Sequence, residues 1–244
     1  MTGWFDKGTP ITELKPDSTA YILTMGQANA GNTSTSLDTA GAGVFSYYKG
    51  ELYPAVDPMI GSTGYGGSVW PLIGDSLIKD KKYNKVVFIP IATGSTHAQD
   101  WATGECNNTL KSILNDMKAK NIKLTHILWH QGESDNGTSK EEYKKNLHKI
   151  LSDIRENGQS APFYCSIASL TPLSKTSPSG IDTNIQQAQI EFINENRGVL
   201  VGPNTDFLNL AVDRYDGVHF SKSGKAKYMN QWLTCLRTNA ELVK

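Results

Sequence analysis

The stretch AYILTMGQANAGNT, residues 20–33, joins a short apolar run to a sharp polar turn. Its first six residues are apolar or β-branched, as is typical of a strand buried in a sheet. In the turn, Gly26 and Gly31 have the spacing of a phosphate loop, but Asn32 stands where that motif has its lysine. A turn after a strand can instead present a nucleophile, and Ala28 occupies the position where the nucleophile would be.

Apolar and amphipathic runs alternate from this stretch to the end of the chain. Further strand-like runs lie at 85–92, 124–130, 162–169 and 198–202. Apolar residues at helical spacing predict helices near 69–79, 110–117, 143–154, 181–196 and 222–237, with a capping box formed by Ser139 and Glu142. Strands alternating with helices predict a three-layer α/β/α sandwich around a five-stranded parallel sheet. Working groups are expected at the carboxyl ends of the strands.

Glycine is concentrated in one part of the chain. Ten of the 22 glycines fall between Gly26 and Gly74, in a stretch rich in Ser and Thr. The stretch has little periodicity before Val69, so we expect a long loop directly after the first strand. Long loops inside compact domains are more often functional than not.

Composition limits the classes of protein that remain. A chain of 244 residues, 38% hydrophobic and 20% charged, fits one domain over 1–244, with 1–18 as an N-terminal extension. The 24 basic and 24 acidic residues cancel, which argues against a nucleic-acid or anionic-membrane partner. No apolar run is long enough to span a membrane, and MTGWFDKGTP lacks the layout of a signal peptide. The cysteines, Cys106, Cys165 and Cys235, are far apart and are expected to be buried thiols.

A candidate catalytic pair lies near the C-terminus, in the sequence DGVHFSKSG. Asp216 and His219 are three positions apart, a spacing at which a carboxylate can hold the imidazole Nδ1–H while Nε2 points outward. That arrangement is the base half of a serine-hydrolase triad. Taken alone, a turn aspartate and a surface histidine would explain the same pattern.

Four motifs in order resemble the conserved blocks of the SGNH (GDSL-like) hydrolases. They are the G-Q-x-N turn, GYGGSVWPLIGDSL (64–77), HQGESD (130–135) and the D-x-x-H near the C-terminus. The sequence is most similar to the sialate O-acetylesterase and acetylxylan-esterase branch, whose nucleophile turn reads G-Q-S-N. The resemblance spans about 20 to 240. It implies a flavodoxin-like sheet, no cofactor, and removal of acetyl groups from an O-acetylated polysaccharide or glycan.

The resemblance also assigns roles to residues. Ala28 falls on the nucleophilic serine and is the clear departure from the pattern, while His219 falls on the general base and Asp216 on its orienting acid. The implied oxyanion-hole donors are the backbone N–H of Gly67 or Gly66, the side-chain amide of Gln131, and the N–H of residue 28. Donors of this kind stabilise the negative charge that develops on the ester oxygen. We expect Glu133 to be a buried brace and Asp135 a turn residue.

The loop ATGSTHAQDW, residues 92–101, resembles a Gly-Ser/Thr-rich loop of the same branch. Ser95 and Trp101 are candidates for the sugar pocket, with plain packing as the alternative. His97 and His130 have no second histidine or carboxylate at a metal-ligand spacing, so we expect no metal site.

Two explanations of Ala28 stay open. Either an engineered substitution has replaced a serine by alanine, or the natural protein is a non-catalytic carbohydrate-binding pseudoenzyme that retains the esterase pocket. The turn, the oxyanion candidates and the Asp216–His219 pair all read as intact, which favours the first. The resemblance is compatible with a larger multidomain or oligomeric assembly and with an extracellular, cell-surface or phage-tail location.

Overall fold

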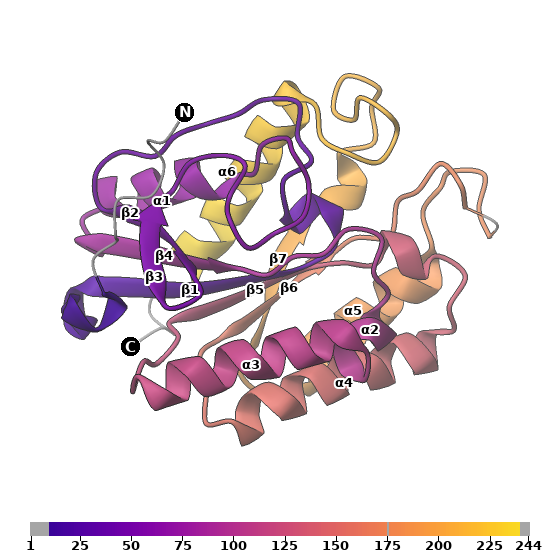
Figure 1. The fold of residues 1–244 in the computed structure, drawn as a ribbon. Helices are drawn as coiled ribbons and strands as arrows, with labels where there is room; N and C mark the ends of the chain where they lie inside the picture. Colours follow the sequence, from indigo (N-terminus) through magenta and orange to yellow (C-terminus); the bar gives the residue numbers. More distant parts are fainter. Residues whose placement is uncertain (1–9, 175, 240–244) are drawn as a thin grey trace.

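The structure is a computed structural model that describes residues 10–174 and 176–239. At its centre is a seven-stranded sheet in the order β3-β2-β4-β1-β5-β6-β7 (Figure 1). The strands are β1 (Thr19–Gly26), β2 (Val44–Tyr48), β3 (Glu51–Pro54), β4 (Lys85–Pro90), β5 (His126–His130), β6 (Phe163–Ile167) and β7 (Val199–Asn204). Every neighbouring pair is parallel except β2 with β3.

The five strands predicted from the sequence all form, as β1, β4, β5, β6 and β7. Numbered among themselves, they have the order 2-1-3-4-5 of flavodoxin-like sheets. β1 is therefore central, between β4 and β5, and all eight of its residues are buried. Strands covered on both faces are uniformly apolar rather than alternating, which explains the continuous run AYILTM.

Helices cover both faces of the sheet, as Figure 1 shows. On one face lie α1 (Trp70–Lys79) and α6 (Lys222–Thr238). On the other lie α2 (Ala98–Ala102), α3 (Glu105–Ala119), α4 (Lys140–Glu156) and α5 (Thr183–Glu195). Ser139 caps α4 as predicted, because its Oγ accepts the Glu142 N–H at 3.3 Å, which is one of the two hydrogen bonds of the predicted capping box. The three-layer α/β/α sandwich is confirmed, and the short helix α2 is an addition to it.

Two separate apolar cores result, one on each face of the sheet. The core under α1 and α6 is built around the rings of Trp70, Phe88 and Trp232. The core under α2 to α5 contains the Trp101–Trp129 pair and Phe163. Ile11 also packs into this second core, at 1% exposure, so the predicted N-terminal extension contributes to it.

The prediction of a long loop after β1 is wrong in one respect, because this segment contains the hairpin β2–β3. The turn of the hairpin is Lys49-Gly50, with φ of 47° and 93°. Positive φ at both central positions gives the twist that two-residue hairpins need. β2 also pairs in parallel with β4 and so extends the sheet from five strands to seven. The glycines around the hairpin hid its short run of aromatic residues.

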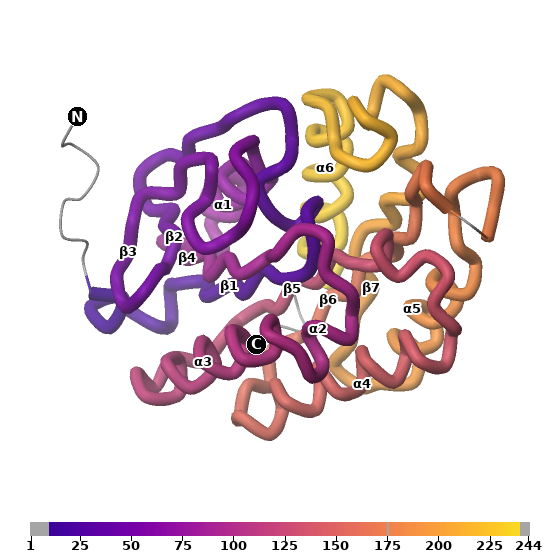
Figure 2. The backbone as a smooth tube through the Cα atoms, turned by 45° about the vertical axis from the view of Figure 1, so that its right-hand side comes forward, coloured from indigo at the N-terminus to yellow at the C-terminus, as the bar shows by residue number. Residues whose placement is uncertain are grey.

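Loops at the carboxyl ends of the strands converge on one edge of the molecule. Figure 2 shows the segment after β1 lying beside α6, although the two are far apart in the sequence. Three short 3-10 helices follow β1, β5 and β7 at this edge: η3 (Ala28–Ala30), η4 (Glu133–Asp135) and η5 (Thr205–Phe207). Within the described ranges, none of the helices is both long and apolar enough to cross a membrane.

Candidate active site

Residue 28 lies in a tight turn at the carboxyl end of the central strand. β1 ends at Gly26, where φ is +125° and an added Cβ would lie 2.0 Å from the backbone oxygen of His130. Only glycine fits so close to the neighbouring strand. The chain then forms η3, in which Ala28 is 7% exposed. A Cβ added at Gly94, after β4, would lie 3.8 Å from the Ala28 methyl group, so that methyl group borders the loop after β4.

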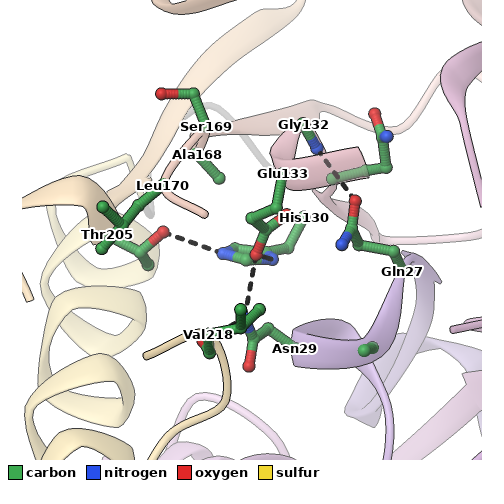
Figure 3. A network of polar contacts seen from close by, with 12 residues as sticks. Gln27, Asn29, His130, Gly132, Glu133, Ala168, Ser169, Leu170, Thr205 and Val218 are labelled. Atoms are coloured by element: carbon green, nitrogen blue, oxygen red, sulfur yellow. Dashed lines mark hydrogen bonds and ion pairs between the residues drawn. The ribbon is translucent and has the colours of Figure 1, made fainter. Parts of the chain in front are cut away.

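The turn is held by the side chains that follow residue 28. Asn29 Nδ2 donates to Glu133 Oε1 at 2.8 Å and to the backbone oxygen of Val218 at 3.1 Å (Figure 3). Thr33 Oγ1 donates to the backbone oxygen of Ala28 at 2.8 Å. These bonds fix the turn without using any side-chain atom of residue 28.

The Asp216–His219 pair forms as predicted from its spacing. His219 Nδ1 lies 2.6 Å from Asp216 Oδ2, and Asp216 Oδ1 accepts the backbone N–H groups of Val218 (2.9 Å) and His219 (2.7 Å). Partial burial raises the pKa of Asp216, but the hydrogen bonds from His219 and the backbone outweigh it, and the net shift is downward. An ionised Asp216 holds the proton on Nδ1 and leaves Nε2 free to accept one.

Arg214 sets the shape of the loop that carries this pair, and the sequence analysis missed it. Its buried guanidinium donates to the backbone oxygens of Leu208 (2.6 Å), Thr205 (2.7 Å) and Val218. It also lies over the ring of Phe220, 4.6 Å from the centroid. A lone arginine in a loop with three aspartates was the available signal, but backbone acceptors cannot be read from a sequence.

The loop 205–220 is joined to the segment after residue 28 at three points. The hydrogen bonds run from Asn29 Nδ2 to Val218 O (3.1 Å), from Tyr215 Oη to Thr33 O (3.2 Å), and from Thr35 N to Phe220 O (3.3 Å). The Tyr215 ring also stacks on His219 at 6.0 Å. The segment after residue 28 and the loop 205–220 are thereby placed side by side at one edge of the sheet, although Asn29 and Val218 are 189 positions apart in the chain.

Under the turn lies a buried polar network around His130 (Figure 3). His130 Nε2 is 2.9 Å from Thr205 Oγ1, and its Nδ1 is 3.8 Å from Glu133 Oε1. Burial lowers the pKa of His130, so its imidazole is neutral. Glu133 is the buried, hydrogen-bonded brace that we expected, because it accepts from Asn29 at 4% exposure.

The glycine N–H groups expected in an oxyanion hole have other acceptors. Gly66 N–H donates to Asn32 O and Gly67 N–H to Ser34 O, both at 2.9 Å. These bonds form because 32–34 and 66–67 pair side by side, with an antiparallel bridge between Ser34 and Gly67. The geometry therefore does not support Gly66 or Gly67 as oxyanion donors.

Gln131 is likewise committed to the scaffold. Its Nε2 donates to Thr96 O (3.1 Å) and Asp135 Oδ2 (2.5 Å), and its Oε1 accepts from Tyr143 Oη (3.0 Å). Since both amide protons are used in this buried position, Gln131 would have to exchange a partner to reach an oxyanion. Asp135 also accepts the Ala98 N–H at 2.8 Å, so it anchors α2 to this loop.

Gly94 is the glycine that the structure places next to residue 28, and it was not among the residues singled out from the sequence. Its N–H donates to the Thr63 hydroxyl at 2.7 Å, so Gly94 would also have to exchange a partner to reach an oxyanion. Ser95 follows it, exposed and with φ of +60°. Non-glycine residues in this strained region concentrate at functional sites. The available signal was a glycine directly after a buried strand.

Trp101 is a correction to the expected sugar pocket. It is fully buried, its Nε1 donates to Thr96 Oγ1 at 3.0 Å, and its ring meets Trp129 edge-on at 5.7 Å. The packing alternative therefore holds for Trp101. Nearby, His97 Nδ1 lies 3.6 Å from Asp135 Oδ1. Over residues 10–174 and 176–239, no three or more His, Cys, Asp or Glu side chains are grouped so as to hold a metal ion.

Comparisons with known proteins now add to this geometry. Residues 65–233 match the SASA family, described as carbohydrate esterase, sialic acid-specific acetylesterase. The chain belongs to this carbohydrate esterase family. A search of curated proteins found no match to the chain.

Solved structures with the same fold are distant in sequence. A protein from Arabidopsis thaliana is 14% identical, with a TM-score of 0.74, over 92% of this chain and 99% of that one. A carbohydrate acetylesterase from Xanthomonas citri is 13% identical, with a TM-score of 0.65, over 89% and 55%. A lipase/acylhydrolase from Enterococcus faecalis is 14% identical, with a TM-score of 0.56, over 91% and 96%. The fold is that of the SGNH hydrolases.

Proposed function

We propose that this chain is the esterase domain of a carbohydrate O-acetylesterase with Ala28 at the position of the nucleophilic serine. The observation that carries the proposal is the hydrogen-bonded Asp216–His219 pair, in a loop bonded to the turn of residue 28. The substrate class follows from the family, and would be an O-acetylated polysaccharide or glycan. Without a hydroxyl at position 28, the chain as it stands would bind such a substrate and leave it intact.

With serine at position 28, the residues present supply the remaining steps. His219 Nε2 would take the proton of the hydroxyl as its oxygen attacks the ester carbonyl, and Asp216 would hold the imidazole. The backbone N–H groups of residue 28 and Gly94 would stabilise the oxyanion, with Gly94 in place of Gly66 or Gly67. His219 would then give the proton to the departing sugar oxygen. Water would release acetate from the acyl-enzyme by the same route.

The test compares the chain with its Ala28→Ser variant on p-nitrophenyl acetate. Loss of a triad serine costs roughly 10⁶-fold in turnover, so the variant should be faster by a factor approaching that value. The matched control is Ala28→Ser with His219→Ala, which has the same hydroxyl and no base. Equal turnover by the chain and the Ala28→Ser variant would show that the nucleophile has been misplaced.

The second candidate is a non-catalytic carbohydrate-binding protein. It is favoured by Ala28 itself, because the methyl group at this position offers no nucleophile. One result distinguishes the two candidate functions: the Ala28→Ser variant binds an O-acetylated polysaccharide but cleaves neither the polysaccharide nor p-nitrophenyl acetate. That outcome would support the binding protein.

A further inference from the structure

Two tyrosines beside the turn of residue 28 are exposed. Tyr65 is 97% exposed and Tyr215 is 52% exposed. Single exposed aromatic residues are common on protein surfaces, so exposure alone has little meaning. The backbone that presents these two rings is unusual.

Tyr65 is the only residue with a side chain in the segment 64–67. A Cβ added at Gly64 would lie 2.1 Å from Asn32 O, one at Gly66 2.3 Å from Ser34 O, and one at Gly67 1.7 Å from Ser36 O. The backbone of this segment is therefore pressed against 32–36, with no space for side chains between them. The Tyr65 ring projects into solvent from a backbone that cannot easily move.

The segment beneath Tyr65 is itself fixed. Ser34 and Gly67 exchange two backbone hydrogen bonds, both 2.9 Å. Lys225 Nζ, from α6, donates to Ser36 O at 2.8 Å and lies 2.6 Å from Asp38 Oδ2 and 3.2 Å from Asp57 Oδ2. A ring held on a rigid base loses little conformational entropy when it binds a ligand.

Tyr215 attaches to the same segment from the opposite side. Along 32–35, the groups of Asn32 and Ser34 bond to 66–67, whereas those of Thr33 and Thr35 bond to 215–220. Alternate backbone groups of an extended segment point to opposite sides, so the two tyrosine loops flank it. Tyr215 reaches Thr33 O through its side-chain hydroxyl, so the segment 32–35 lies between the two tyrosine loops. A ligand that packs on both rings has to cross this segment.

We propose that Tyr65 and Tyr215 form an aromatic platform on which neighbouring sugar rings of an O-acetylated polysaccharide pack, with the acetyl ester at residue 28. The proposal rests on the proposed function and narrows the class of substrate. The substrate is a polymer or oligosaccharide rather than a free acetylated sugar, because a ligand that packs on both rings has to extend across the segment 32–35 that separates the two loops. Apolar C–H faces of sugar rings packing on the tyrosine faces remove both from water.

The binding test uses the chain as it is, which holds substrate without cleaving it. Affinity for O-acetylated xylan and O-acetylated pectin is measured by calorimetry, with an O-acetylated monosaccharide as comparison. We expect at least one of the polysaccharides to bind more tightly than the monosaccharide. Tyr65→Ala and Tyr215→Ala should each weaken that binding by about tenfold or more, and Tyr65→Trp should retain it.

The matched control is Tyr53→Ala, a partly exposed tyrosine on the edge strand β3 whose hydroxyl lies 3.3 Å from Glu51 Oε2. It should bind like the parent, and thermal unfolding should show that all variants are folded. The platform is refuted if neither polysaccharide binds, if the monosaccharide binds equally well, or if folded Tyr65→Ala binds like the parent.

A kinetic arm separates this proposal from the proposed function. In the Ala28→Ser background, Tyr65→Ala should raise KM for the polysaccharide much more than it lowers kcat. Tyr65 is used here because Tyr215 also stacks on His219. If Ala28→Ser fails to cleave p-nitrophenyl acetate, the proposed function fails. If it cleaves the ester and Tyr65→Ala leaves KM for the polysaccharide unchanged, the platform alone fails.

Discussion

Replacing Lys225 by methionine should strongly destabilise the protein. The Lys225 side chain is 3% exposed and that of Asp57 is 0% exposed, so methionine would leave a buried carboxylate without its counter-charge. Removing one partner of a buried ion pair typically costs about 3–5 kcal/mol of the free energy of unfolding. The upper part of that range is expected, because Asp38 loses the same partner.

The pH dependence of this loss has a definite sign. Burial raises the pKa of Asp57 above its ordinary 3.8, although Lys225 and the hydrogen bonds from Ser68 and Asp38 oppose the shift. Without Lys225 the pKa of Asp57 rises further, so the native state holds this proton more tightly than the unfolded state. Stability then falls as pH rises above about 4. The difference between parent and Lys225→Met should therefore be larger at pH 7 than at pH 4.

Urea unfolding at both pH values measures the effect, and Arg237→Met is the matched control on the same helix. Arg237 pairs with Asp80 at the surface, with side chains 52% and 34% exposed, and such pairs contribute about 0–1 kcal/mol. Lys225→Met combined with Asp57→Asn should recover part of the loss. If Lys225→Met loses no more stability than Arg237→Met, Lys225 does not neutralise Asp57.

Four further predictions concern the Ala28→Ser variant. In p-nitrophenyl acetate assays its rate should fall in acid, because the imidazole of His219 must be neutral to accept a proton. His219→Ala should remove both this pH dependence and most of the activity. Asp216→Asn should lower kcat by roughly 10³–10⁴-fold by favouring the wrong tautomer, and a kcat within tenfold of the parent would contradict the role of Asp216. EDTA should leave the rate unchanged, whereas activity restored only by added zinc or calcium would contradict this mechanism. Acetate esters should be cleaved faster than octanoate, since the loops 26–68 and 203–221 are rich in Gly, Ser, Thr, Asn and Asp and an octanoyl chain needs apolar surface to leave water; faster octanoate cleavage would exclude the carbohydrate assignment.

The parts of the fold that depend on local pattern could be predicted from the sequence. Buried parallel strands are continuous apolar runs, and β1, β4, β5 and β6 follow that pattern. The hairpin β2–β3 was missed because its aromatic run is short and glycines flank it. Its Lys49-Gly50 turn was the usable signal.

The sequence predicted those contacts of the candidate site that follow from the spacing of residues along the chain. It did not predict the contacts that depend on which distant segments meet in the fold. The Asp216–His219 contact follows from three positions of separation in a turn. The engagement of Gly66 and Gly67 with 32–34, and the burial of Trp101 against Trp129, depend on which segments meet in space. A sequence does not give these contacts, because hydrogen-bond acceptors on the backbone are the same for every residue type.

The turn around residue 28 is held by Asn29 and Thr33 and by no side-chain atom of residue 28. In the genetic code, alanine codons and one group of serine codons differ only at the first base. A single point mutation can therefore exchange the two residues while the architecture around them persists. If the proposed function holds, one base change converts a hydrolase into a carbohydrate-binding protein, because the bonds made by Asn29 and Thr33 do not depend on the side chain at position 28.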